Sequence, residues 1–84
     1  MRRITVCGHP WTIVSARQTT TDRVLGECLG PPRRMIRVRL TGDRLTDRDT
    51  LIHELIHAVE YERGVDIGHG RVRAIAETLA RARA

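Results

Sequence analysis

The feature that most constrains this chain is an H-E-x-x-H motif, His53-Glu54-Leu55-Ile56-His57. Side chains four residues apart lie on one face of an α-helix, so His53 and His57 can offer two imidazole nitrogens to one metal ion. Neutral imidazoles are favoured zinc ligands, at Zn–N distances of about 2.0–2.1 Å, and a carboxylate at the position of Glu54 can reach a metal-bound water without displacing it. If the motif is helical, it therefore predicts a hydrolytic zinc site.

The residues around the motif carry the signals of a helix. Apolar residues occupy nearly every side of its helical wheel, as in a helix buried in a small core; they are Leu51, Ile52, Leu55, Ile56, Ala58 and Val59. We predict Thr46 as the N-cap, acidic residues in the first turn and Gly64 as the end. The alternative is a core helix with a coincidental spacing. It would bury two imidazoles and a carboxylate without partners, at a cost on the order of several kcal/mol that a metal ion removes.

The length of the chain predicts a single domain, residues 1–84. A domain of this size buries only about 60% of the surface of its unfolded chain, so its core is marginal and a bound metal ion would add stability. Phe is absent and Trp and Tyr occur once each, so the core must be built from Ile, Leu, Val and Ala.

The charged residues are strongly biased towards arginine. Fifteen Arg and no Lys oppose ten acidic residues, for a net charge of +5. Such a charge attracts polyanions, so an Arg-rich nucleic-acid-associated protein is one alternative function. No recognition motif or aromatic platform accompanies the charge, and a solvated surface biased towards arginine explains it more simply.

The N-terminal sequence and the cysteines bear on location. Residues 1–3 lead directly into a β-prone stretch, with no apolar run long enough for a signal peptide or a membrane span, so we expect a cytoplasmic protein without membrane contact. Cys7 and Cys28 are too few for a disulfide framework and do not form a CxxC pair. We expect reduced thiols, of which Cys28 needs no special role although it could bind a soft metal.

Three segments before the motif alternate in the manner of β-strands. Residues 3–7 and 11–16 flank Gly8-His9-Pro10, which predicts a hairpin with His9 in its loop, as a solvated side chain or as a ligand or transition-state group. Residues 33–40 predict a third strand, whose outward arginines would suit a sheet edge. Residues 17–27 show no clear period and predict a loop, which a Gly-Pro-Pro turn closes.

After Gly64 and a short connector, residues 69–83 predict a second helix, with an apolar stripe formed by Val72, Ile75, Ala76 and Leu79. Strands followed by helices indicate an α+β fold, in which two helices pack on one face of a small antiparallel sheet of about three strands. A substrate peptide could then add to the edge of the sheet beside the metal.

Three residues compete to be the third metal ligand, namely His69, Glu77 and Asp66. At about 100° per residue, the apolar stripe of the second helix must face the motif helix. His69 falls near the border of that stripe and Glu77 well round towards solvent. The geometry therefore favours His69 as the third ligand, with Glu77 as the main alternative.

The whole pattern resembles a known family. The stretches that carry the resemblance are 4–6, 11–14, the turn from Gly26-Glu27-Cys28 to Pro31-Pro32, 34–38 and 49–58. They resemble the minimal zincin-like metallopeptidases of phages and bacteria, which share their layout with SprT-like and ImmA-type zinc metallopeptidases. The resemblance covers nearly the whole chain and implies a zincin fold, hydrolysis of peptide bonds in a protein or peptide, and a bacterial or phage-infected host cytosol. Relatives often carry a glutamate where this chain has His69, although SprT-like proteins have a histidine followed by glycine, as in His69-Gly70.

The function we predict is that of a zinc-dependent peptidase. His53, His57 and the third ligand hold Zn²⁺, which activates a water, and Glu54 takes the proton of that water and passes it to the leaving amine. Glu60 lies on the same face and is expected to orient a histidine or pair an arginine rather than bind the metal. Tyr61 stands where a residue stabilises the oxyanion in zincins, and its alternative role is that of a core aromatic at the helix end.

A second alternative function is a non-catalytic zinc-stabilised module. In that case the metal ion serves as a staple for a small core, and Cys28 or a carboxylate closes the fourth coordination position. Glu54 argues against this alternative, because a purely structural site has no use for a carboxylate at that position of the motif.

Overall fold

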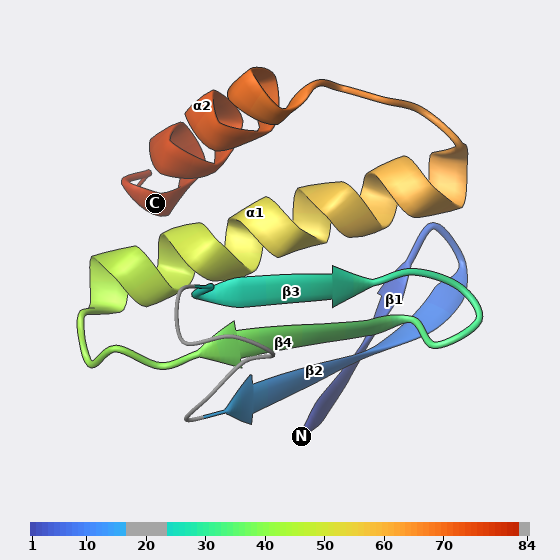
Figure 1. The fold of residues 1–84 in the computed structure, drawn as a ribbon, viewed down its shortest axis with the longest axis horizontal. Helices are drawn as coiled ribbons and strands as arrows, with labels where there is room; N and C mark the ends of the chain where they lie inside the picture. Colours follow the sequence, from blue (N-terminus) through green and yellow to red (C-terminus); the bar gives the residue numbers. More distant parts are fainter. Residues whose placement is uncertain (17–23, 83–84) are drawn as a thin grey trace.

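The computed structural model describes residues 1–16 and 24–82, which form one four-stranded sheet followed by two helices (Figure 1). The elements in chain order are β1 (Arg2–Val6), β2 (His9–Ala16), β3 (Gly26–Leu29), β4 (Met35–Arg39), α1 (Arg44–Arg63) and α2 (His69–Ala80). The predicted α+β class is confirmed, with one strand more than expected. Neither helix of the described chain is both long and apolar enough to cross a bilayer.

The strands of the sheet lie in the order β1-β2-β4-β3. β1 and β2 pair antiparallel, β2 and β4 pair parallel, and β4 and β3 pair antiparallel. The sheet is therefore mixed rather than antiparallel, and β4 is an inner strand rather than an edge. The missed strand is β3, in the segment predicted as loop and turn, because a strand of four residues that begins with glycine is too short to show a period. The rest of the predicted loop, residues 17–23, lies outside the described residues.

The hairpin between β1 and β2 is tighter than predicted. Its two-residue turn is Cys7-Gly8, and both residues have positive φ, 50° and 84°. Such a turn matches the twist of the flanking strands, and glycine supplies one of the two positive φ angles without strain. β2 consequently starts at His9, which pairs with Val6. The prediction of His9 as a loop residue is wrong for this reason.

One face of the sheet packs against α1, and α2 lies on the far side of α1 (Figure 1). The core between sheet and helix contains Val6, Trp11, Ile36, Val38 and Ala58. Trp11 is only 1% exposed, and it is the large aromatic of this core, since the chain has no Phe. α1 is therefore the central layer of the domain, in contact with the sheet on one side and with α2 on the other.

The N-terminus of α1 lies earlier than predicted. Its N-cap is Asp43 rather than Thr46, and the Asp43 carboxylate accepts hydrogen bonds from the Thr46 amide, at 3.3 Å, and from the Thr46 hydroxyl. These bonds lower the pKa of Asp43. Thr46 is itself a good N-cap residue, but with Asp43 in that position the amide of Thr46 is one of those that the cap satisfies. The predicted end at Gly64 is observed, with φ 63°.

α2 packs on α1 through small residues. Val72, Ala76 and Ala80 are buried, whereas Ile75 and Leu79 are 41% and 49% exposed. The predicted stripe that included Ile75 and Leu79 is therefore wrong in part. Alanines spaced by four residues let the two helices approach closely, which the bulkier residues would prevent. α2 ends at Ala80, earlier than the predicted end at Arg83, which itself lies outside the described residues.

Candidate metal centre

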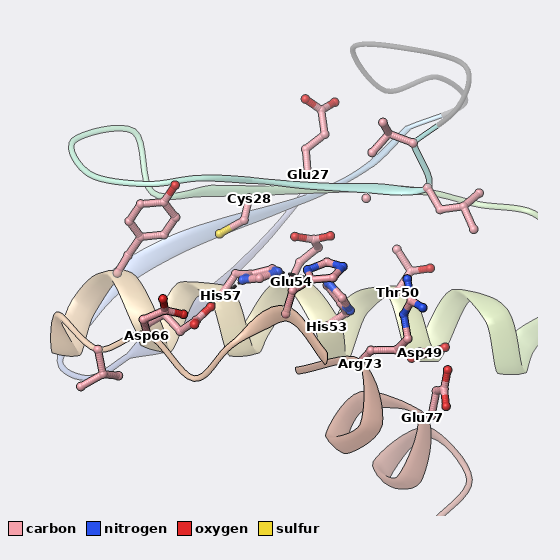
Figure 2. A pocket seen from close by; sticks show the side chains of 17 residues that line it. Glu27, Cys28, Asp49, Thr50, His53, Glu54, His57, Asp66, Arg73 and Glu77 are labelled. Atoms are coloured by element: carbon pink, nitrogen blue, oxygen red, sulfur yellow. Dashed lines mark hydrogen bonds and ion pairs between the residues drawn. The ribbon is translucent and has the colours of Figure 1, made fainter. Parts of the chain in front are cut away.

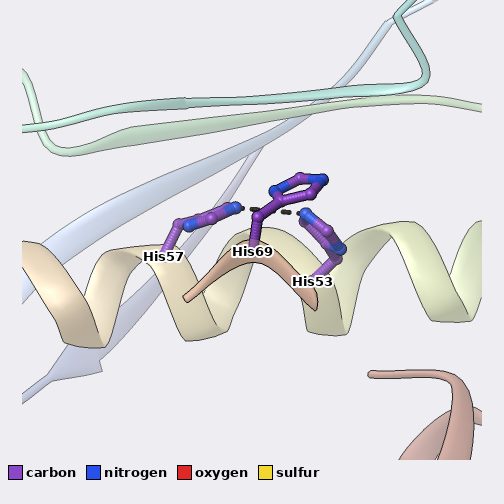
Figure 3. A group of neighbouring side chains, drawn as sticks. All are labelled: His53, His57 and His69. Carbon is purple, nitrogen blue, oxygen red and sulfur yellow. Dashed lines mark hydrogen bonds between the residues drawn. The ribbon is translucent and has the colours of Figure 1, made fainter. Parts of the chain in front are cut away.

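Three histidines from two helices meet at one point (Figure 3). His53 and His57 lie one turn apart on α1, and His69 is the first residue of α2. One ring nitrogen of each lies within 4.8 Å of the others, and the Nε2 atoms of His53 and His57 are 3.1 Å apart. Three imidazole nitrogens that converge in this way can bind a single metal ion.

The connector between the helices brings His69 to the other two histidines. The amide of Ile67 donates a hydrogen bond of 2.8 Å to Glu60 Oε2, near the C-terminal end of α1. The amide of Gly68 donates to Asp66 Oδ1 at 3.0 Å, and Gly68 has a φ of 95° that favours glycine. The connector is thus fixed to α1 immediately before His69.

Glu60 also fixes the orientation of His57. Its Oε1 lies 2.6 Å from His57 Nδ1, which is the histidine contact expected for this residue. The hydrogen bond from the Ile67 amide, followed by that from His57, lowers the pKa of Glu60. An ionised Glu60 keeps the proton on Nδ1 of His57, so Nε2 remains free to bind a metal.

The environment of His53 favours its neutral form. Burial is the largest cause of its lowered pKa, and the neighbouring His57 and His69 add to the effect. A neutral imidazole is the form that binds metal ions. Arg73 lowers the pKa of His53 further, whereas Asp49 opposes the shift.

Glu54 is a buried carboxylate beside the three histidines. It is 8% exposed and makes no hydrogen bond to any described residue. Burial raises its pKa, with the positive charge that His57 can carry acting in the opposite direction. A carboxylate in such a position can accept a proton, which is the role of a general base.

A cavity of about 870 Å³ opens over these residues, between α1, β3 and the start of α2 (Figure 2). The three histidines, Glu54 and Glu60 all line it, together with Cys28, Tyr61, Asp66 and Glu77. A volume of this size accommodates a peptide segment.

The other candidate ligands line the cavity but do not join the histidines. The described residues contain one group of ligand atoms close enough to share a metal ion, and it includes neither Cys28, Asp66 nor Glu77. Burial first, and then the charges of Glu54 and Glu60, raise the pKa of the Cys28 thiol to about 12. Its distance from the histidine group, rather than its protonation, excludes Cys28 as a fourth member of that group.

Tyr61 stands at the mouth of the cavity rather than in the core. It is 55% exposed, so the alternative role of a core aromatic does not apply. Its ring lies against the backbone of Gly30, where an added Cβ would approach the ring to 2.6 Å. This contact fixes the ring beside the end of β3.

Several residues of the site were not predicted from the sequence. Gly26 lies against Glu54, whose Oε2 would be 2.9 Å from a Cβ at that position. Asp49 and Arg73 line the cavity as well. Their spacing carried a signal, because Asp49 lies one helical turn before His53 and Arg73 one turn after His69. Gly26 carried none, since its role depends on the unpredicted strand β3.

His9 lies outside the cavity and has a different role. Its Nε2 is 3.3 Å from Glu62 Oε2, and Arg34 Nε is 2.6 Å from Glu62 Oε1. These three residues, named here the Glu62 cluster, join the C-terminal end of α1 to β2 and to the turn before β4. A role of His9 as a metal ligand has no support in this arrangement.

The donor set of the three histidines fits zinc. Imidazole nitrogens are among the ligands that Zn²⁺ prefers, and a catalytic zinc site takes three protein ligands and leaves one position open. Glu60 behind His57 is the kind of partner that zinc-binding histidines have. No family model, no curated protein and no solved structure matches the chain.

Proposed function

We propose that this protein is a zinc-dependent peptidase. The observation that carries the proposal is the convergence of His53, His57 and His69 beside Glu54, a buried carboxylate that has no hydrogen-bond partner among the described residues. A structural zinc site needs the ligands but not the carboxylate, and a hydrolytic site needs both.

The histidines and the zinc ion have separable roles. His53, His57 and His69 would hold Zn²⁺, with His57 oriented by Glu60. The bound ion supplies Lewis acidity, lowering the pKa of water towards about 7 and polarising a carbonyl group. Glu54 accepts the proton of the attacking water and delivers it to the leaving amine. The Tyr61 hydroxyl, at the mouth of the cavity, is a candidate donor to the carbonyl oxygen of the substrate.

The substrate we propose is an extended protein or peptide segment. β3 is an edge strand of the sheet and lines the cavity with Gly26, Glu27 and Cys28. A peptide that pairs with this edge would pass in front of the histidines, with its main chain held by backbone hydrogen bonds. The open edge and the reactive groups therefore lie on the same side of the domain.

The class and location of the protein are part of the same proposal. The layout of a sheet, a motif helix and a last helix that begins with His69-Gly70 supports a minimal zincin-like peptidase of SprT-like or ImmA type. Cys7 and Cys28 are both free, which suits a reducing compartment. We therefore propose that the protein acts in a bacterial or phage-infected host cytosol.

Two measurements on the purified protein test this function. We expect about one zinc ion per chain, and a lower Tm after chelation, because the ligands come together only in the folded chain. On a peptide library, Glu54→Gln should retain zinc and Tm but lose hydrolysis by about 10²–10⁴-fold, because an amide cannot accept the proton. Full hydrolysis by Glu54→Gln, or an unchanged Tm without metal, would contradict the proposal.

A further inference from the structure

The cavity is acidic although the chain as a whole is basic. The net charge of the chain is +5, and fifteen arginines outnumber ten acidic residues. The carboxylates that line the cavity are Glu27, Asp49, Glu54, Glu60, Asp66 and Glu77. Arg73 is the one arginine among the described residues that lines it. Negative charge is thus concentrated where a substrate would bind.

Two of these carboxylates have no role in the folded chain. Glu54 and Glu60 belong to the candidate metal centre, the side chain of Glu27 points away from α1 (Figure 2), and Asp66 accepts the Gly68 amide. Asp49 and Glu77 remain. Within the described part of the chain, neither side-chain carboxylate makes a hydrogen bond or an ion pair, although Arg73 lines the same cavity and Arg81 donates to the backbone carbonyl of Glu77.

Asp49 and Glu77 lie at the same end of the cavity. Figure 2 shows them beyond His53, on α1 and α2 respectively, whereas Asp66 lies at the opposite end beyond His57. Asp49 is half-buried and close enough to His53 to oppose the lowering of its pKa. Asp49 therefore adjoins His53, and Glu77 lines the same end of the cavity from α2.

The strand opposite supplies apolar walls at this end. β3 runs in the same direction as α1, because Gly26 lies against Thr50 and Glu54, while Gly30 lies against Tyr61. Residues just before Gly26 therefore lie at the Asp49 end. They are Val24 and Leu25, which line the cavity and are 37% and 40% exposed.

A second observation also points to a ligand here. Glu54 is 8% exposed, has no hydrogen-bond partner among the described residues and lines the same cavity beside His53. A buried carboxylate without a partner is unfavourable unless a bound group compensates it. The end of the cavity that contains Asp49 and Glu77 is thus open, acidic and continuous with the reactive groups.

We propose that this end of the cavity, the Asp49–Glu77 subsite, binds an arginine or lysine side chain of the peptide substrate. The inference rests on the proposed peptidase function. The aliphatic stem of such a side chain would pack on Val24 and Leu25, and its cationic head would meet the two carboxylates. Only a long basic side chain offers both properties.

The contrast between the cavity and the remaining surface increases selectivity. An acidic cleft with low-dielectric walls raises the local concentration of cations, whereas the surrounding arginines repel basic segments elsewhere on the surface. Basic segments are therefore directed to the cavity, and acidic segments are drawn away from it.

Peptide binding to the zinc-loaded Glu54→Gln variant tests the subsite without hydrolysis. The peptides share one sequence and differ at one central position, which is Arg, Lys, norleucine or Glu. We expect the Arg and Lys peptides to bind about tenfold more tightly than the norleucine peptide, because their cationic heads form charge-assisted hydrogen bonds with the two carboxylates. The Glu peptide should bind least tightly.

Substitutions in the same background assign the effect to the subsite. Glu77→Gln and Asp49→Asn should each reduce the preference for Arg over norleucine, whereas Ala74→Lys, an exposed change on α2 that also adds one positive charge, should leave it unchanged. Arg73→Gln should increase the preference, and Arg71→Gln, on the same helix but outside the cavity, should not.

The outcomes separate the subsite from the proposed function. Equal binding of the Arg and norleucine peptides, absence of binding by all four, or a preference that persists without both carboxylates would overturn the subsite. Cleavage of all four peptides by the wild-type protein at similar rates would also overturn it while leaving the peptidase function intact. Preferential binding of the Arg peptide without any cleavage would support the subsite and contradict the peptidase function.

Discussion

Two buried carboxylates on α1 have opposite environments. Glu54 is 8% exposed and has no hydrogen-bond partner among the described residues, and burial raises its pKa. The side chain of Glu62 is 2% exposed, and its carboxylate contacts Arg34 at 2.6 Å and His9 at 3.3 Å. The hydrogen bond from Arg34 is the largest cause of the lowered pKa of Glu62. One helix thus carries one buried carboxylate without hydrogen-bond partners among the described residues and one, Glu62, with two partners.

The side chain of Trp11 also lies near Glu62. Its indole N–H is near enough to Glu62 to contribute to the lowered pKa, but its geometry is outside that of a hydrogen bond. Among the described residues the Trp11 nitrogen has no hydrogen-bond partner, so Arg34 and His9 hold the Glu62 carboxylate.

The difference between the two sites separates stability from function. A buried carboxylate with charged partners is compensated within the fold, and its loss leaves a cation without a partner. A buried carboxylate without partners lowers stability, so its presence is explained by a ligand or a reaction. By this argument we expect the Glu62 cluster to hold the domain together, and we propose that Glu54 serves the candidate metal centre.

The largest effect that tests this comparison is expected for the third metal ligand. His69→Ala should reduce zinc affinity by more than about 100-fold, because it removes a ligand itself. Loss of a residue that only hydrogen-bonds a ligand reduces metal affinity by about 10–100-fold. Glu77→Ala, which removes a carboxylate of the cavity outside the histidine group, should retain tight zinc binding. Both affinities are measured by competition with a chromogenic chelator. Loss of zinc in Glu77→Ala with retention in His69→Ala would transfer the third ligand to the carboxylate.

A smaller effect is expected for Glu60, the residue behind His57. Glu60→Gln should reduce zinc affinity by about 10–100-fold, because an amide orients the imidazole less strongly than a carboxylate. It should also weaken the hydrogen bond that the Ile67 amide donates to Glu60 Oε2. Amide hydrogen exchange at Ile67 provides a second readout. Unchanged affinity together with unchanged exchange would show that Glu60 fixes neither His57 nor the connector.

The next effect concerns stability and distinguishes Glu54 from Glu62 directly. In metal-free protein, Glu62→Gln should lower Tm, because Arg34 loses its charged partner. Glu54→Gln should leave Tm unchanged or raise it, because it removes a buried charge that has no partner. Zinc affinity should stay unchanged in Glu62→Gln, which lies outside the cavity. If Glu54→Gln is instead the more destabilising variant in thermal melts, the two carboxylates do not divide function from stability.

The sequence predicted correctly those features that depend on residues close together in the chain. The motif helix, its end at Gly64 and the histidine contact of Glu60 follow from helical spacing and from the residue types that end helices. The fold class follows from the order of the elements. The N-cap was displaced because Asp43 and Thr46 both qualify, and the helix begins after the first of the two.

The parts that could not be predicted depend on non-local packing. β3 is defined by its pairing with β4, and the close approach of Gly26 to Glu54 exists only after that pairing forms. The predicted apolar stripe of α2 correctly included Val72 and Ala76, but it also included Ile75 and Leu79, whereas helix packing buried Ala80. Asp49 illustrates an intermediate case, since its spacing from His53 was readable but its free carboxylate was not.

The smallest expected effect is a change in the acid dependence of stability. The folded pKa of Glu62 lies below its ordinary value of 4.5. A lowered carboxyl pKa adds stability that is fully present above the unfolded pKa, about 4.3, and is lost as the pH falls through the folded pKa. In metal-free protein, the Tm difference between wild type and Glu62→Gln should therefore be constant near pH 6 and shrink below about pH 4. The charged groups that face Glu62 are Arg34 and His9. Because Arg34 is the main cause of the shift, Arg34→Gln should weaken this acid dependence more than His9→Gln does, and equal acid dependence in wild type and Arg34→Gln would assign the fixation of Glu62 to another group.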